Sequence, residues 1–258
     1  MSSPLIEMRD ISKTFGAVTA LSHVSLYVPE GGVVGLVGDN AAGKSTLMKI
    51  LAGAIEHDTG EILINGQLAG YNSPTSARAF GIEMIYQDFA LVPNLSVAQN
   101  IFLGREIMCR RRIGPNTLDQ TEMNRKATEL FAALGLRVPS VKLPVQALSG
   151  GQQQAVAIAR ATGFDAKLVI MDEPTANLGA PAIEKVRETI TRLKQSGVAV
   201  IIISHRLEDI FAIGDAIVVM KQGRLVAERE IDDTDNAEVV EMIVTGRDPR
   251  DDRHEADA

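Results

Sequence analysis

The sequence predicts an α/β fold: a core of mainly parallel sheet with a small antiparallel sheet before it and a helical subdomain inserted into it. Three observations predict this fold. An apolar run at residues 33–37 leads through a glycine-rich turn into a helical segment at 47–53. Further apolar runs of strand length, at 168–171 and 199–203, alternate with helical segments and end on polar residues. Between residues 95 and 161 the pattern becomes helical, with few strand signals.

Composition narrows the class of protein. The chain has 258 residues, enough for one large domain or two small ones. Its formal net charge of −7 argues against a surface that coats nucleic acid, so we expect no nucleic-acid partner. One cysteine, Cys109, permits no internal disulfide, which fits a reducing compartment. The N-terminus shows no signal-peptide pattern, and every apolar run is too short to span a bilayer.

The first part of the chain predicts an antiparallel sheet. Short apolar runs at residues 5–8, 20–21 and 24–28 alternate with turn residues. Phe15 lies within this stretch. It can be an exposed aromatic that stacks on a nucleotide base, or a core residue of the sheet, and the residues alone favour neither alternative.

The glycine-rich turn has the phosphate-loop spacing G-x-x-x-x-G-K-[ST], with a strand before it and a helix after it. Such a loop supplies backbone N–H groups and the positive end of a helix dipole to a polyphosphate. Lys44 adds a charge for the β- and γ-phosphates, and the Ser45 hydroxyl can bind Mg²⁺. The predicted phosphate-binding residues are Gly38, Asp39, Asn40, Ala41, Ala42, Gly43, Lys44, Ser45 and Thr46.

The loop is followed by a predicted strand and turn at residues 60–66, a short helix at 76–80 and a strand at 83–86 that ends on Gln87. Ligands bind near the carboxyl ends of strands in such sheets. The Gln87 amide is therefore a candidate ligand-binding group, with ordinary loop polarity as the alternative.

The helical insert contains helical periods at residues 97–103 and 122–131, with an arginine triplet at 110–112 that we interpret as a solvated connector. Near its end, Ser149, Gly150, Gly151 and Gln152 open a helix over 153–161. A serine cap followed by paired glycines exposes the N–H groups of a helix. The chain thus holds a second helix N-terminus suited to phosphate, which suggests nucleotide sites shared between subunits.

The run at 168–171 ends in two acids, Asp172 and Glu173. Because adjacent side chains of a strand point to opposite faces, the two carboxylates can serve different purposes. Asp172 suits outer-shell binding of Mg²⁺, and Glu173 suits polarising a water against a γ-phosphate. His205, just past the strand at 199–203, can reach a γ-phosphate, although a lone histidine is more often structural.

The rest of the chain completes the fold. We predict a helix at 181–196, strands at 216–220 and 224–228, and a helix at 236–245. The tail at 247–258 is almost wholly polar and is predicted to be disordered.

Taken in this order, the motifs resemble the ATP-binding subunit of an ABC transporter over about residues 5–246. The sequence LSGGQ at 148–152, between a phosphate loop and an acidic strand, is their most diagnostic part. The resemblance implies one ATP-binding domain at 1–246, with the helical subdomain at about 95–161. It also implies that Phe15 packs on adenine, that Gln87 touches Mg²⁺ and the attacking water, and that His205 is the switch histidine.

The same resemblance implies cofactors and partners. ATP and Mg²⁺ would bind between two copies arranged head to tail, with the phosphate loop of one facing Ser149, Gly150 and Gly151 of the other. Integral-membrane permease subunits would be further partners, with Gln87 sensing them, and a periplasmic-type sugar-binding protein would act indirectly. The chain would then lie peripherally on the cytoplasmic face of the inner (plasma) membrane.

Three segments narrow the subgroup, because they resemble the ATP-binding subunits of importers for ribose, xylose, galactose or fructose. These segments are residues 101–106, 148–160 and 173–179. Many of those subunits carry two ATP-binding domains, whereas this chain has each motif once. It most resembles the single-domain, fructose-type members. The function we expect is ATP hydrolysis coupled to uptake of a monosaccharide such as fructose or ribose.

Two residues depart from the family pattern. Ala41 stands where most members have glycine, and a positive φ there would cost roughly 1–2 kcal/mol. Gly179 replaces the usual aspartate and removes one contact between subunits, although sugar-importer members often show this change. Inactivity follows from neither departure.

Three other functions are alternatives to this one. A soluble ABC ATPase of translation or DNA repair would carry two ATP-binding domains with a basic linker, or long coiled coils, and this chain shows neither. A regulatory subunit without catalysis is disfavoured by the intact Lys44, Asp172, Glu173 and His205. An importer for another solute is a further alternative.

Overall fold

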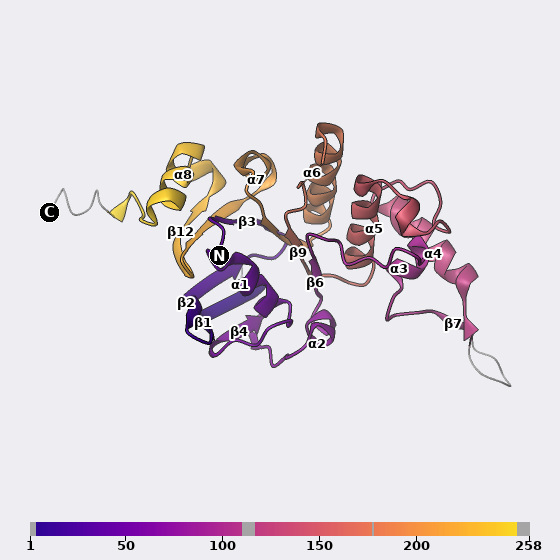
Figure 1. The fold of residues 1–258 in the computed structure, drawn as a ribbon, viewed down its shortest axis with the longest axis horizontal. Helices are drawn as coiled ribbons and strands as arrows, with labels where there is room; N and C mark the ends of the chain where they lie inside the picture. The colour runs from indigo at the N-terminus through magenta and orange to yellow at the C-terminus, as the bar shows by residue number, and fades with distance from the viewer. Residues whose placement is uncertain (1–3, 110–116, 177, 252–258) are drawn as a thin grey trace.

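The computed structural model describes residues 4–109, 117–176 and 178–251 of the chain. The arginine triplet at 110–112 lies outside these residues. Figure 1 shows two β-sheets on either side of helix α1 (Lys44–Leu51), with an arm of helices extending from one end of the larger sheet. No helix within the described ranges is both long and apolar enough to cross a membrane.

The larger sheet has six strands in the order β12-β11-β3-β10-β9-β6. Neighbouring strands are parallel except β11 and β12, which pair antiparallel. The central strands are buried on both faces, which is why they form continuous apolar runs that the sequence pattern reveals. The strands are β3 Val33–Gly38, β6 Ile82–Ile85, β9 Leu168–Asp172, β10 Ala199–Ile203, β11 Ala216–Lys221 and β12 Arg224–Glu230.

The smaller sheet is antiparallel, in the order β2-β1-β4-β5. The fragments predicted at 5–8, 20–21 and 24–28 belong to two long strands. Register shifts and positive φ angles at Asp10 and His23 interrupt the alternation of side chains, so the sequence pattern shows only pieces. The strands are β1 Ile6–Phe15, β2 Val18–Val28, β4 Thr59–Ile64 and β5 Gln67–Leu68.

The helices cover the larger sheet on both faces. Helix α1 buries Leu47, Met48 and Leu51 in one core with both sheets. The opposite face packs against α5 (Gly150–Thr162) and α6, and α7 and α8 pack beside β11 and β12. The helices outside the arm are α2 Pro74–Ala79, α6 Ala180–Gln195, α7 Leu207–Ile213 and α8 Asn236–Thr245, with a 3-10 turn at Ile231–Asp233.

The arm contains α3 Val97–Ile101, α4 Gln120–Ala133, α5 Gly150–Thr162 and a 3-10 turn at Val145–Ala147. These elements lie in the stretch predicted to be helical. The arm also carries two short antiparallel strands that the sequence analysis missed, β7 Met108–Cys109 paired with β8 Thr117–Leu118. Strands of two residues are too short to show an alternating pattern.

The tail differs from its prediction. Residues 247–251 are held in place, because Asp248 accepts a 2.6 Å hydrogen bond from Arg229 and Arg250 donates one of 2.8 Å to Glu238. The prediction of disorder is therefore wrong for these residues, while 252–258 lie outside the described part. Polar composition does not show which charges pair in the folded chain.

Candidate functional site

The phosphate loop connects the buried strand β3 to helix α1. Gly38 has a φ of 145°, and a Cβ at this position would lie 2.1 Å from the carbonyl oxygen of Met220. Gly43 is the N-cap of α1 with a φ of 97°, and a Cβ there would lie 2.8 Å from the carbonyl oxygen of Ala20. Both positions require glycine, and the tight turn that they allow brings the N-terminal turn of α1 to a surface cavity.

Lys44, the first residue of α1, folds back over the loop. Its Nζ donates to the carbonyl oxygens of Gly38 at 2.8 Å and Asp39 at 2.9 Å. Burial lowers the pKa of the Lys44 ammonium, and the nearby carboxylates of Glu173 and Asp172 oppose this change. The Lys44 ammonium therefore lies against the loop, with its charge supported by two acids.

Ala41 has a φ of 66°, which confirms that this loop position requires the left-handed region. We expect Ala41→Gly to raise the free energy of unfolding by about 1 kcal/mol, because glycine adopts this backbone conformation without a Cβ clash. Urea denaturation measures the change. Ala42→Gly is the matched control: Ala42 is buried and lacks a positive φ, so this substitution should destabilise the protein. A loss of stability in both variants would contradict the prediction.

The two acids lie at the end of β9. The backbone N–H of Glu173 donates to the carbonyl oxygen of Ile203 in β10 at 2.9 Å, and Glu173 has a φ of 53°. This geometry brings Oε1 of Glu173 to 3.2 Å from Nε2 of His205 without hydrogen-bond alignment. Among the described residues, the buried Oε1 has no hydrogen-bond partner. A buried carboxylate oxygen with free accepting capacity is suited to a ligand or a water.

The electrostatics of the two acids follow from their burial. Desolvation raises the pKa of the Glu173 carboxyl, and the neighbouring His205 opposes part of that rise. Desolvation also raises the pKa of Asp172, with Lys49 and Lys44 opposing it. A carboxyl whose pKa is higher in the folded than in the unfolded chain destabilises the fold at neutral pH, and this cost disappears as pH falls below its unfolded pKa.

We therefore expect Asp172→Asn to raise the Tm of the protein at neutral pH, in EDTA and without nucleotide, by about 1 to 3 °C. The gain should be modest because water still reaches the carboxyl, and it should shrink as pH falls through the carboxyl range. Thermal unfolding at several pH values measures it. Asp232→Asn removes an exposed charge and serves as the control. An equal gain in both variants, or a gain independent of pH, would contradict this prediction.

The predicted residues of the strand ends meet in one cavity of about 310 Å³. They do so because β3, β6, β9 and β10 are parallel and their carboxyl ends share one edge of the sheet. Gly38 and Asp39 line an adjoining cavity together with His205. The lining residues of the first cavity are Asn40, Ala41, Ala42, Gly43, Lys44, Ser45, Thr46, Gln87, Asp172, Glu173, Ile203 and His205.

This cavity, called here the phosphate-loop cavity, contains donors that suit a magnesium ion. Ser45 offers a hydroxyl oxygen, Gln87 an amide oxygen and Asp172 a carboxylate oxygen. Mg²⁺ prefers oxygen ligands and takes the remainder of its shell from water and phosphate. The residues present therefore fit the ion.

Phe15 lies at the end of β1, opposite Val18. The residue is 48% exposed, and the Nζ of Lys13 lies 5.5 Å from the centroid of its ring. The alternative of a core residue is therefore wrong. Phe15 does not line the phosphate-loop cavity, so its stacking on adenine stays a prediction.

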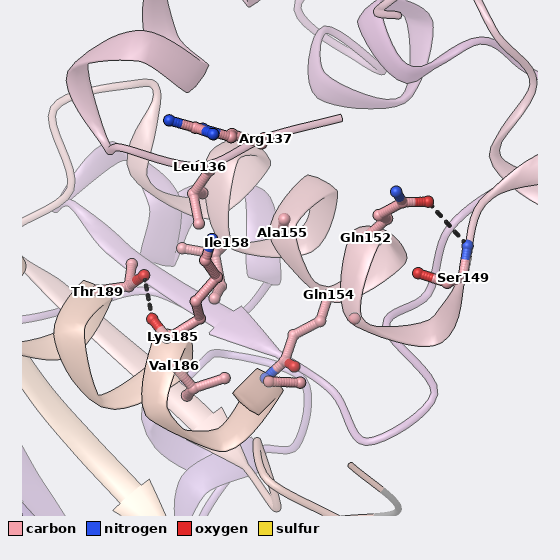
Figure 2. Close-up of a pocket in the computed structure, with 12 residues that line it drawn as sticks. Leu136, Arg137, Ser149, Gln152, Gln154, Ala155, Ile158, Lys185, Val186 and Thr189 are labelled. Atoms are coloured by element: carbon pink, nitrogen blue, oxygen red, sulfur yellow. Dashed lines mark hydrogen bonds between the residues drawn. The ribbon is translucent and has the colours of Figure 1, made fainter. Parts of the chain in front are cut away.

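The serine–glycine motif lies elsewhere on the chain. Ser149 precedes α5, and its backbone N–H donates to Oε1 of Gln152 at 3.0 Å. Figure 2 shows Ser149 and Gln152 at one end of a second cavity, of about 290 Å³, between α5 and α6. Ser149, Gly151 and Gln152 line it, and none of the described residues lines both this cavity and the phosphate-loop cavity. The phosphate loop and the serine–glycine motif of one chain thus line separate cavities.

Gly179 is the N-cap of α6. A Cβ at this position would meet only Cδ of Pro181, at 3.9 Å. The backbone therefore has room for the aspartate that the family pattern would place there. Glycine at this position removes a carboxylate and is not required by a steric clash.

One buried group was missed by the sequence analysis. Asp209, in α7, is 2% exposed and accepts a 2.6 Å hydrogen bond from Oγ1 of Thr175 and a 3.1 Å bond from Nε of Arg187. It therefore ties the segment after Glu173 to the helix after His205. A single acid in a helical pattern carries no signal that could have revealed this pairing.

The sequence of this chain is similar to sequences of known proteins. A model of the ABC transporter family matches residues 21–176. The xylose/arabinose import ATP-binding protein XylG of Sulfolobus acidocaldarius is 42% identical over 94% of this chain and 95% of that protein. The ribose import ATP-binding protein RbsA of Chromobacterium violaceum is 44% identical over 93% of this chain and 47% of its own length. The chain spans about half the length of that ribose relative.

Solved structures share the fold. An ATP-binding cassette of an ABC transporter in its ADP conformation has a TM-score of 0.78 and 25% identity, over 96% of this chain and 97% of that one. A dimeric cassette in a post-hydrolysis state, bound to ADP and Pi, has a TM-score of 0.74 and 25% identity, over 88% and 98%. These similarities confirm the predicted fold class.

Proposed function

This chain belongs to the ABC transporter family, and on that premise we propose that it is the ATP-hydrolysing subunit of a monosaccharide importer. The observation that carries the proposal is the phosphate-loop cavity, in which Lys44, Gln87, Asp172, Glu173 and His205 meet. A loop that binds phosphate, a buried acid with an unused oxygen and a neighbouring histidine are the parts that hydrolysis of a γ-phosphate requires.

Each side chain has a role that its position supports. Lys44 neutralises the β- and γ-phosphates, because its ammonium is held beside the loop by hydrogen bonds to two carbonyl oxygens of that loop. Glu173 accepts the proton of the attacking water, and its raised pKa brings it nearer to the range of an effective general base. His205, 3.2 Å from Glu173, contacts the γ-phosphate. Closure of the site around these groups excludes bulk solvent, retains the attacking water and completes the catalytic arrangement.

Magnesium completes the cofactor set. Ser45, Gln87 and Asp172 would hold the ion, and its positive charge would stabilise the charge that develops on the phosphate oxygens. The adenine base would stack on Phe15, which is exposed and therefore available to a ligand.

The assembly that we propose is a head-to-tail pair of chains. The phosphate loop and the serine–glycine motif line different cavities of one chain, so a second copy is needed to bring them onto one nucleotide. Such a pair has an isologous interface, in which each copy supplies the same two surfaces to the other. The dimeric cassette among the similar structures supports this arrangement.

The permease contact would lie where the arm meets the larger sheet. A cavity of about 360 Å³ at this junction is lined by Tyr86, the residue before Gln87, and by Arg105 and Phe164. The Arg105 guanidinium lies 4.4 Å from the centroid of the Phe164 ring. A permease segment bound here would press on the residue next to the site, on the cytoplasmic face of the plasma membrane, with the sugar-binding protein acting through the permease.

The substrate class rests on the relatives, which are named for import of xylose/arabinose and ribose. These names favour a sugar importer over a translation or repair ATPase and over an importer of another solute. The finer assignment to the single-domain, fructose-type members rests on the motif resemblance alone.

The proposal is tested by deleting the gene in its host and measuring uptake of labelled xylose, ribose and fructose. We expect uptake of at least one of these sugars to be lost, restored by the wild-type chain and not by a Glu173→Gln variant expressed at the same level. Unchanged uptake of all three sugars, with loss of uptake of an unrelated solute, would overturn the sugar assignment while leaving the ATPase intact.

A further inference from the structure

The side chain of Lys221 joins the phosphate loop to the C-terminal end of helix α8. Its Nζ donates to Oδ2 of Asp39 at 2.6 Å, to the carbonyl oxygen of Ile243 at 2.6 Å and to that of Val244 at 3.1 Å. The three N–H bonds of the ammonium therefore each have an acceptor. The Lys221 side chain is 21% exposed and the Asp39 side chain 52% exposed, so the lysine is partly buried while its partner carboxylate faces solvent.

The position of Lys221 follows from the fold. It is the last residue of β11, and the residue before it, Met220, is paired with Gly38 at the start of the loop. Helix α8 ends at Thr245, and its C-cap Gly246 has a φ of 70°. A Cβ at Gly246 would lie 3.0 Å from Cγ of Lys221, so the glycine leaves space for the lysine chain.

Asp39 connects this contact to the site. Its carboxylate accepts from Lys221, and its carbonyl oxygen accepts from Nζ of Lys44 at 2.9 Å. The same residue therefore holds the lysine of the site on one side and is held by Lys221 on the other. A shift of Asp39 would move an acceptor of Lys44.

Lys221 also balances the charge beside the loop. Asp39 contributes a full negative charge, and the C-terminal end of α8 carries about half of one. Both lie next to a loop that must accept an anionic triphosphate. Without the Lys221 ammonium, this balancing charge would be lost and the two negative sources would repel the ligand more strongly.

We propose that Lys221 is a positioning residue of the phosphate loop, which holds Asp39 in place, cancels its charge and makes α8 part of the nucleotide site. This inference rests on the proposed function, because it requires a triphosphate to bind at residues 38–46. It assigns the role through a contact with Asp39 and does not place Lys221 on the nucleotide itself.

The test measures KM and kcat for Mg²⁺-ATP in purified variants. Lys221→Met is expected to raise KM about tenfold and to change kcat by about twofold or less, because the repulsion acts on binding. Lys221→Gln keeps an amide NH₂ group for the α8 carbonyls and loses the charge, so its KM should rise by a similar factor. This second variant tests the proposal even if Lys221→Met does not fold. Lys221→Arg should stay within about twofold of wild type.

The decisive measurement adds Asp39→Asn. Removing the aspartate charge should reduce the effect of Lys221→Met to about twofold, because little negative charge remains to be balanced. If Lys221 only supported the packing of α8, Lys221→Met would cost as much in the Asp39→Asn variant as with the aspartate present, and that result would overturn the proposal. So would a KM for Lys221→Met or Lys221→Gln equal to that of wild type.

The matched control is a second lysine–aspartate pair, in which a lysine of α6 contacts an aspartate near the other end of β11. Lys194 pairs with Asp215, the residue just before β11, far along the strand from the loop. Lys194→Met should leave KM unchanged, and an equal rise there would overturn the proposal by showing a general effect of lost charge. If wild-type protein does not bind ATP at all, the proposed function fails, and this outcome is distinct from normal wild-type binding with unaffected Lys221 variants.

Discussion

Glu173→Gln is expected to lower kcat for ATP hydrolysis about 10³-fold while ATP still binds. The amide has nearly the same shape as the carboxylate but cannot accept the proton of the attacking water. Burial raises the pKa of this carboxyl, and its Oε1 has no hydrogen-bond partner in the described part of the chain, so a water is its natural partner. Phosphate release in steady state and nucleotide titration measure the two quantities.

Glu208→Gln is the matched control for this substitution. Glu208 lies three residues after His205, and its side chain is 82% exposed. Because Glu208 does not line the phosphate-loop cavity, this substitution removes a nearby carboxylate without changing the cavity. Its hydrolysis rate should stay within about twofold of wild type. A Glu173→Gln variant that hydrolyses ATP at the wild-type rate would show that the general base has been assigned to the wrong residue.

A mixture of two inactive variants is expected to recover activity if the nucleotide lies between two copies. Lys44→Ala disables the phosphate loop, and Gly150→Asp places a carboxylate on the surface that would face the γ-phosphate. A Cβ at Gly150 meets no atom within 4 Å, so this substitution should leave the fold of its own chain intact. Each variant alone should lose at least about 10²-fold in hydrolysis rate.

In a mixed pair, one site combines both defects, whereas the other combines an intact loop with an intact serine–glycine motif. Random pairing of equal amounts forms mixed pairs in half of the molecules, so the mixture should recover up to about a quarter of wild-type activity. If both surfaces acted within one chain, every site would carry a defect and the mixture would stay inactive. Mixing each variant with buffer alone controls for concentration.

The sequence by itself determined the phosphate loop, the acidic strand and most of the larger sheet. Their signals are local: Gly38 and Gly43 are needed for backbone conformations inside the loop itself, and the strands buried on both faces form unbroken apolar runs. Helices of ten or more residues also show their period clearly, as α8 does over the predicted range. The common edge reached by Asp172, Gln87 and the loop follows from parallel strands alone.

Elements whose signals are short or interrupted needed the tertiary structure. The antiparallel pair β7–β8 has two residues in each strand, and the bulges at Asp10 and His23 hid the length of β1 and β2. The environment of Phe15 also stayed open, because a hairpin end can point an aromatic to either side. Only the packing of the smaller sheet shows that this side chain is exposed.

The pairings of charged groups were decided by the tertiary structure alone. Lys221 meets Asp39 across 182 residues, Asp209 meets Thr175 and Arg187, and Asp248 meets Arg229. Periodicity and spacing report which face of a helix or strand a residue occupies, because they follow backbone geometry that repeats within a few residues. Which partner a buried charge meets depends on strand order, register and helix packing, and these are properties of the folded chain as a whole.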